Sequence, residues 1–355
     1  MSVPKFSAKP DSFHAELKRR VTDYFEKAGK PTTGNFYLYF KGGLLGLLLL
    51  AVYIHLVFYT PPLWLSIIEC VLLGGLISAI GFNVMHDGAH GSFSKNKTIN
   101  LLAAFSLNIL GGSSFMWNVK HNIIHHAFTN VDGVDDDIDI QPWMRMSSTQ
   151  KKYKLHKYQH RYFWVLYALL YILWIFVLDY QKYFKQKIGT MHLKKMHLSD
   201  HIVFWLFKAI HLFVFVVLPI WMVGFLPWMV GFLIFTLVAG LVLSIVFQLA
   251  HTVEHTHFPM PDSESGRLRD EWAIHQLKTT ANFATGNKII SALVGGLNFQ
   301  VEHHLFPKIS HVHYPAISKI IKQTCKEFNV PYIEYQHMRT ALASHVAYLR
   351  LMGNS

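Results

Sequence analysis

The sequence predicts an all-α integral membrane protein: four transmembrane helices in two hairpins, with interfacial helices and a histidine-rich cap on the cytoplasmic side. Hydrophobic residues make up 52% of the 355 residues and charged residues only 15%, a balance that is too apolar for an ordinary soluble protein. Several apolar runs are long enough to cross a bilayer as a helix. The chain also contains 23 histidines, and clusters of them stand directly beside these runs.

Four apolar runs are the predicted membrane spans, at residues 42–59, 62–82, 202–222 and 228–250. Pro61 and Pro62 separate the first two runs, and the stretch GFLP at residues 224–227 separates the last two. Proline and glycine in such short connections favour turns, so each pair of runs is predicted to form a tight hairpin.

A further apolar run at residues 161–179 is ambiguous because basic residues flank it on both sides. Loops with an excess of Lys and Arg stay in the cytoplasm, so a true span would put one of these flanks on the wrong side. We therefore interpret this run as an interfacial or re-entrant helix. Both termini and the loops 83–200 and 251–355 are then predicted to be cytoplasmic.

Residues 1–35 form a polar N-terminal segment that lacks the apolar core of a secretory signal, and we expect this segment to stay in the cytoplasm. Residues 36–355 contain no fixed-period repeat and no low-complexity linker, which indicates one membrane domain. The formal net charge is +12, which predicts a basic face toward anionic lipid or acidic partner proteins.

Nine histidines stand in four clusters that each follow an apolar segment: His86 and His90; His121, His125 and His126; His251 and His255; His303 and His304. Histidines four residues apart share one face of a helix. A single pair of this kind is more often a surface or packed pair than a metal site. Four clusters on one predicted side of the membrane favour metal binding, and we expect hairpin packing to bring all nine imidazoles into one site.

The number and type of these residues limit the choice of metal. Zinc sites use about four ligands, so nine histidines indicate two metal ions, and imidazole suits iron, copper, zinc and nickel alike. The two cysteines have no C-x-x-C spacing, which excludes a cysteine-ligated iron–sulfur cluster.

Three of the clusters resemble the histidine boxes of the membrane-bound fatty acid desaturases. They are HDGAH at residues 86–90, HNIIHH at 121–126 and QVEHH at 300–304, and the Gln-x-x-His-His form of the last box is similar to the front-end subgroup. HHAFTN, TTANF and HHLFPKISHVHY match the family as well, so the resemblance covers roughly residues 80–315. The His-Pro-Gly-Gly motif of a fused cytochrome b5 does not occur, and the chain resembles the short bacterial acyl-CoA or linoleoyl-CoA desaturases.

The resemblance implies a reaction in which two iron ions reduce O2 and remove hydrogens from adjacent methylenes of a long acyl chain. It assigns His86, His126, His255 and His304 to one iron, and His90, His121, His125 and His303 to the other. His251 and Gln300 would complete the two ligand shells directly or through water, and Gln300 is the candidate catalytic residue.

The partners of the reaction also follow from the resemblance. The substrate would be a long-chain acyl-CoA or acyl-lipid in the membrane, and a separate ferredoxin, flavodoxin or cytochrome b5 would supply electrons, with no nucleic acid involved. Basic residues between Lys151 and Arg161 would meet a CoA or phospholipid phosphate, although the positive-inside tendency alone also explains them. We expect the bacterial cytoplasmic membrane rather than the endoplasmic reticulum, with the active site on the cytoplasmic side.

Two other functions compete with desaturation. A di-iron lipid hydroxylase or ketolase would use similar histidine boxes, and the QVEHH box favours desaturation over it. A membrane metal transporter would hold its ions near the bilayer midplane, whereas these clusters lie beyond the ends of the predicted spans.

Overall fold

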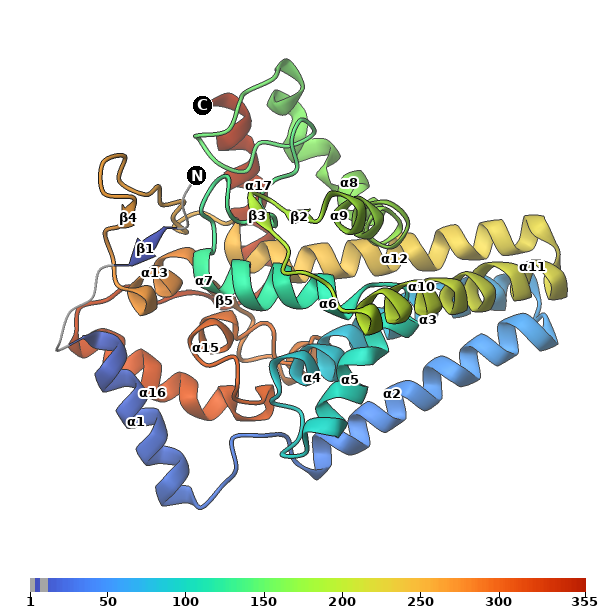
Figure 1. Ribbon diagram of the computed structural model, residues 1–355, viewed down its shortest axis with the longest axis horizontal. Helices are drawn as coiled ribbons and strands as arrows, with labels where there is room; N and C mark the ends of the chain where they lie inside the picture. Colours follow the sequence, from blue (N-terminus) through green and yellow to red (C-terminus); the bar gives the residue numbers. More distant parts are fainter. Residues whose placement is uncertain (1–3, 7–11) are drawn as a thin grey trace.

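The computed structural model describes residues 4–6 and 12–355, and nearly all of its regular structure is helical (Figure 1). The long apolar helices are α2 (Phe36–Ile54), α3 (Leu63–Ile80), α8 (Gln159–Leu173), α10 (Leu198–Leu212), α11 (Leu218–Val223) and α12 (Phe225–His251). Short irregular turns extend several of them into five continuous helices that are long and apolar enough to cross a membrane: Phe36–Tyr59, Leu63–His90, Lys154–Lys185, Leu198–Val223 and Phe225–His251.

The four predicted runs fall in four of these helices, and the fifth, Lys154–Lys185, contains the ambiguous run 161–179. By length and composition the described residues therefore hold five candidate spans, one more than the four predicted. α3 packs against α2 and α12, and α8 packs against α12. Figure 1 shows α2, α3, α10, α11 and α12 extending together toward one end, whereas the later part of the fifth helix is seen nearly end-on beside α12.

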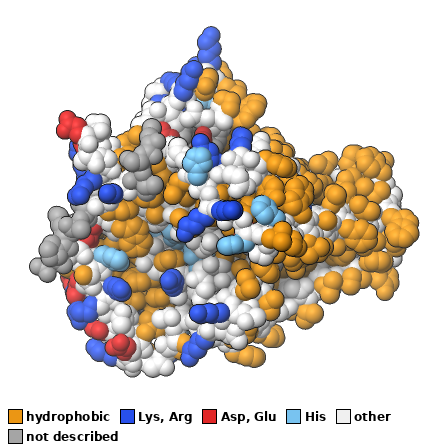
Figure 2. Space-filling view, viewed as in Figure 1, with side chains coloured by type: hydrophobic (Ala, Val, Ile, Leu, Met, Phe, Trp, Pro, Cys, Tyr) orange, Lys and Arg blue, Asp and Glu red, His pale blue; other side chains and the backbone are white. Residues whose placement is uncertain are grey.

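Hydrophobic side chains gather over the end of the molecule where these helices extend (Figure 2). The exposed hydrophobic residues of these helices include Leu47 on α2, Trp64 on α3 and Trp221 on α11, which are 67%, 65% and 79% exposed. An apolar surface of this extent is stable in lipid and not in water. The protein is therefore an integral membrane protein, and its charged side chains lie mostly over the opposite part of the face in Figure 2.

The remaining helices are α1 (Phe13–Ala28), α4 (His86–His90), α5 (Lys97–Ile109), α6 (Ser114–Trp117), α7 (His126–Phe128), α9 (Asp179–Lys185), α13 (Trp272–Thr279), α14 (Lys288–Leu293), α15 (Gln300–Leu305), α16 (Tyr314–Glu327) and α17 (Met338–Asn354). Short strands pair two by two: β1 (Lys5–Phe6) with β4 (Arg267–Leu268) in parallel, β2 (Lys187–Ile188) with β3 (Met191–His192) antiparallel, and β5 (Ala281–Phe283) with β6 (Ile333–Tyr335) in parallel. These pairs join loops, and the fold remains helical as predicted.

Helix α1 covers the side of the molecule that faces away from the apolar helices (Figure 1). The side chain of Ser12 caps its first turn by accepting the Ala15 N–H, and Gly29 ends it in the left-handed conformation with φ 59°. Its buried residues recur every four positions, at Phe13, Leu17, Val21 and Phe25, and they join one hydrophobic cluster with residues of α13, α15 and α16.

The segment between α5 and η3 (Asn118–His125) reverses inside the apolar part of the fold. α5 and the helix Ser114–Phe128 are long and apolar enough to cross a membrane only when they are taken together. The chain bends by 109° between them. We call residues 109–113 the re-entrant tip. Gly111 lies at this bend with φ 96°, a conformation that side chains other than glycine rarely adopt.

Candidate metal centre

Four separate segments carry the predicted ligands to one place. The first box is α4, which continues α3 through the π-helical turn Gly81–Met85, so the span extends outward as the sequence predicted. η3 and α7 carry the second box, α12 ends in His251, and α15 carries the third box. The first box and His251 thus stand at the ends of two long apolar helices, whereas the second and third boxes lie on shorter helical segments outside the five candidate spans.

The structure brings seven of the nine predicted histidines together in two groups. Each group offers ring nitrogens that all lie within 4.8 Å of one another: His86, His90, His121 and His303 in the first, and His125, His251 and His304 in the second. His126 lies between the groups. Its Nε2 is 3.2 Å from Nε2 of His121 in the first group, and its ring centroid is 4.5 Å from that of His304 in the second.

His255 is the predicted ligand that the structure does not bring to the cluster. The sequence argument assumed that α12 continues through His255, but the helix ends at His251 and Thr252 already has non-helical angles of φ −123° and ψ 57°. His255 itself has φ 76° and is exposed to solvent. The i and i+4 relation therefore does not apply, and His251 alone represents this segment.

The grouping also differs from the predicted division between two irons. The prediction separated His86 from His90 and His303, whereas the structure places these three with His121. Histidines four apart on one helix turn point the same way, so His86 and His90 naturally serve one group. His125 lies with His251 and His304, and it also forms a third set with His121 and Asp137 whose ligand atoms lie within 4.8 Å of one another.

Buried ring nitrogens without a hydrogen-bond partner indicate whether these histidines could bind a metal. Nε2 of His90, His125, His251, His303 and His304 is buried and has no hydrogen-bond partner among the described residues. A buried polar atom left alone is costly, and a cluster of them indicates a missing partner. Burial and the neighbouring histidines hold the pKa of His303 and His304 well below the ordinary value, so both rings are neutral, the form that binds metal. The residues present therefore fit two metal ions.

The other ring nitrogen of several ligands has a partner that fixes its orientation. Nδ1 of His125 lies 3.1 Å from Oδ2 of Asp135, and Nδ1 of His304 lies 2.8 Å from Oε1 of Gln276. Nδ1 of His303 lies 3.1 Å from the Tyr314 hydroxyl. Such partners direct Nε2 toward the metal and are characteristic of histidine metal sites.

The sequence indicated one of these hydrogen-bond partners only by the loop that contains it, and not by its residue. The Asp-rich loop after the second box was a candidate for orienting that box, and Asp135 in it has this position. Gln276 and Tyr314 were missed, because a glutamine in α13 and a tyrosine at the start of α16 carry no local signal. Their roles depend on which segments pack against the boxes.

Two acidic residues beside ligands, Asp87 and Glu302, bind other segments instead of ligands. Asp87 Oδ2 accepts a 2.6 Å hydrogen bond from Ser310 and lies 3.0 Å from Nδ1 of His311. Glu302 accepts hydrogen bonds of 2.7 Å from Asn282 and from the Tyr332 hydroxyl. Burial raises the pKa of Glu302 above its ordinary value, although both hydrogen bonds act in the opposite direction. These contacts join the first and third boxes to the segments that carry Asn282, Ser310 and Tyr332.

Gln300 begins α15, is 1% exposed, and its Nε2 has no hydrogen-bond partner among the described residues. For the di-iron site that the resemblance implies, we expect Gln300→Ala to keep most of the iron but to lose most of the desaturation rate, because an amide is a weaker ligand than imidazole and would tune the site rather than anchor it. Gln300→His should keep the iron and part of the rate. Iron analysis and turnover with saturating donor and substrate measure both, and wild-type turnover of Gln300→Ala would remove this residue from the site.

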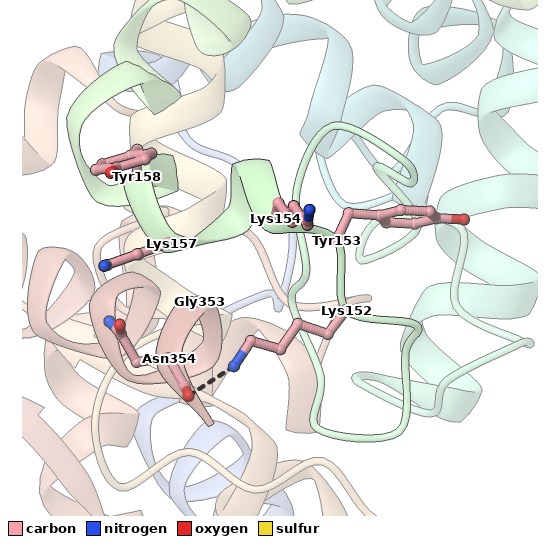
Figure 3. Close-up of a pocket in the computed structure, with 7 residues that line it drawn as sticks. All are labelled: Lys152, Tyr153, Lys154, Lys157, Tyr158, Gly353 and Asn354. Carbon is pink, nitrogen blue, oxygen red and sulfur yellow. Dashed lines mark hydrogen bonds between the residues drawn. The ribbon is translucent and has the colours of Figure 1, made fainter.

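A basic pocket lies apart from the histidines, at the start of the helix Lys154–Lys185 (Figure 3). Its volume is about 550 Å³, and it is lined by Lys152, Tyr153, Lys154, Lys157, Tyr158, Gly353 and Asn354. Nζ of Lys152 donates a 2.7 Å hydrogen bond to the carbonyl of Asn354, drawn as the dashed line in Figure 3. Lys157 and Arg161 also lie near the ring of Tyr158.

Apolar helices that position two groups of buried histidines define a membrane protein with a histidine-rich site able to hold metal ions. Residues 62–336 match the family model described as fatty acid desaturase, and the chain belongs to this family. It is an oxidoreductase of lipid metabolism, as the histidine boxes predicted.

Similar proteins cover almost the whole chain. It is 36% identical to the sn-1 linoleoyl-lipid 6-desaturase of Arthrospira platensis, over 96% of this chain and 92% of the relative. The sn-1 linoleoyl-lipid 6-desaturase of Synechocystis sp. is also 36% identical, over 99% and 98%. An acyl-lipid (8-3)-desaturase of Physcomitrium patens is 36% identical as well, over 98% of this chain and 72% of that protein.

Proposed function

We propose that this desaturase holds two iron ions with its two histidine groups and inserts a double bond into a long-chain acyl group, between an existing double bond and the carboxyl end. The main support is the convergence of the two groups with their unpartnered Nε2 atoms. The relatives named linoleoyl-lipid 6-desaturases support a lipid-bound linoleoyl chain as the substrate and its sixth carbon as the position.

The residues of the chain prepare the site for this chemistry. Bound iron would supply the activation of O2 that removes two hydrogens from adjacent methylenes. Asp135, Gln276 and Tyr314 hold the imidazoles of His125, His304 and His303 in fixed orientations. His303 and His304 are 0% exposed, so the protein excludes bulk water from these two rings, which would limit side reactions of reactive oxygen species there.

The topology proposed with this function has four spans and both termini in the cytoplasm. The fifth candidate, Lys154–Lys185, would lie along the interface. Lysines flank it at both ends, and the exposed aromatic side chains of Tyr158 and Trp164 are of the kind that anchors at a membrane surface. The histidine site would then open to the cytoplasm of a bacterial cell, where the electron donor is.

Two partners complete the proposal. The net charge of +12 supports docking of an acidic carrier, which would be a ferredoxin, a flavodoxin or a cytochrome b5. The lysines of the basic pocket support an anionic group on the substrate, either the phosphates of acyl-CoA or the head group of an acyl-lipid. Lysine binds phosphate as a point charge, so the pocket suits either source.

Expression in a bacterial host without polyunsaturated lipids, followed by feeding of linoleate, tests this function. We expect a new triunsaturated acid whose added double bond lies between the carboxyl group and the ninth carbon, located by mass spectrometry. A metal-free chain, produced under iron chelation, should form none.

The nature of the product separates desaturation from the related reactions. A hydroxylated or keto product would identify a di-iron hydroxylase or ketolase and contradict the proposal. Comparing the acyl-CoA and lipid fractions over time shows in which of the two carriers the new double bond appears first.

A further inference from the structure

An ion pair is buried among the apolar helices, separate from the histidine groups. Nζ of Lys208 on α10 lies 2.9 Å from Oδ2 of Asp179 at the start of α9, and the side chains are 6% and 1% exposed. Lys208 is about 15 Å along its helix from the first residue, Leu198, at the usual helical rise. Ionisable residues buried to this degree are costly and are usually retained for a specific function.

The pair contacts the re-entrant tip from two sides. Lys208 Nζ also donates a 2.7 Å hydrogen bond to the carbonyl of Gly111 and one of 2.9 Å to that of Ile175. Asp179 accepts a hydrogen bond from the backbone N–H of Ser113, and another of 3.1 Å from the indole of Trp174. One partner therefore binds a carbonyl of the tip, and the other binds an amide.

Two further side chains satisfy the neighbouring carbonyls of the tip. The Tyr171 hydroxyl donates to the carbonyl of Leu110, and Nδ1 of His211 lies 3.2 Å from the carbonyl of Ile109. Buried non-helical backbone is stable only where the protein itself supplies its hydrogen bonds. Three successive carbonyls, at 109, 110 and 111, are thus bound by side chains of α8 and α10.

The tip leads directly into the metal ligands. α6 begins at Ser114, immediately after the tip, and ends at Trp117, whose ring stacks on His121 with centroids 4.4 Å apart and lies 5.7 Å from His86. Trp174, the residue that hydrogen-bonds Asp179, packs in one cluster with Trp117. Movement of the tip would therefore move Trp117 and the second histidine box.

We propose that Lys208 and Asp179 are positioning residues for the metal centre: they hold the re-entrant tip in place, and the tip sets the location of His121 and His125. This inference rests on the metal-binding function proposed above and adds a determinant outside the ligand set. In the proposed role the pair does not touch the acyl chain or the ligands. It acts through the backbone of residues 109–117.

Lys208→Met tests the proposal in the purified full-length protein. We expect bound iron and desaturation rate to fall by about 10-fold or more, the range typical of residues that orient metal ligands. Lys208→Arg, which keeps the charge and several donors, should retain most of the iron. Wild-type iron and rate in Lys208→Met would overturn the proposal.

A double variant separates positioning from general stability. Replacing a buried ion pair by apolar residues often restores stability, so Lys208→Met with Asp179→Leu should recover the thermal unfolding temperature in detergent. Iron content should stay low, because Gly111 and Ser113 still lack their partners. Recovery of iron together with stability would show that the pair only stabilises the fold.

Two tyrosines give a matched control. Tyr171→Phe removes a hydroxyl bond to the tip, whereas Tyr53→Phe removes a hydroxyl bond to the carbonyl of Val214, which is outside the tip. Iron content should fall only in Tyr171→Phe, and an equal fall in both would contradict the proposal. Absence of iron from the wild-type protein would instead contradict the proposed function, so the two failures are distinguishable.

Discussion

Replacing His303 with alanine is expected to abolish desaturation and to remove iron from the first histidine group. His303 is fully buried, shares that group with His86, His90 and His121, and contributes a Nε2 atom without a hydrogen-bond partner in the described part of the chain. Loss of a direct ligand should exceed the roughly 10–100-fold effect that follows loss of a residue behind a ligand. Iron per purified chain and product formation from linoleate measure the two effects.

His255→Ala is the matched control for this result. The His255 side chain is exposed and lies outside both groups, so its removal should change iron content and rate by no more than about twofold, as for other surface substitutions. If His255→Ala lost iron as His303→Ala does, the segment after α12 would have to fold back onto the metals. That outcome would contradict the ligand set described here.

The second large effect is expected for Asp135→Asn, which should weaken iron binding at the second group. Asp135 is buried and its carboxylate faces Nδ1 of His125, while the same carboxylate accepts the backbone N–H of Asn130 at 2.9 Å. The substitution removes the negative charge that fixes the imidazole and strengthens it as a ligand, and we expect a loss of about 10–100-fold in iron affinity or rate. Iron titration of the metal-free protein measures the affinity.

Asp139→Asn serves as the control for Asp135→Asn because Asp139 is in the same acidic loop but is exposed. Its iron affinity should match that of the wild type. Tyr314→Phe removes the partner of His303 and should act on the first group instead. Equal affinities in Asp135→Asn and Asp139→Asn would show that Asp135 does not contribute to metal binding through His125.

The histidine boxes could be predicted from the sequence because their chemistry is local. His86 and His90 share a helical face, and α4 does continue α3, so the spacing argument was correct there. The same argument was wrong for His255, since a helix end depends on the contacts of the next segment. Glu254, for example, gives its backbone N–H to Ser344 on α17, a contact that local spacing does not reveal.

The apolar runs predicted the long helices well, whereas their arrangement needed the structure. Hydropathy cannot separate a span from an interfacial helix when both are apolar, which is why Lys154–Lys185 is a fifth candidate. Nor does it reveal the re-entrant tip, because its stability depends on Lys208 and Tyr171, residues about 60 to 100 positions away in sequence. Long-range hydrogen bonds of this kind leave no periodic pattern.

The order in which the ligands emerge during synthesis has a consequence for the living cell. His86 leaves the ribosome first among the ligands and His304 last, and each histidine group takes at least one member from the third box. Neither group can be complete until α15 has been made and has packed beneath α1 and α13. Because metal binding is coupled to folding, we expect iron to enter the proposed site only after translation has passed the last box, and a nascent chain halted before residue 300 would remain in the membrane without either group assembled.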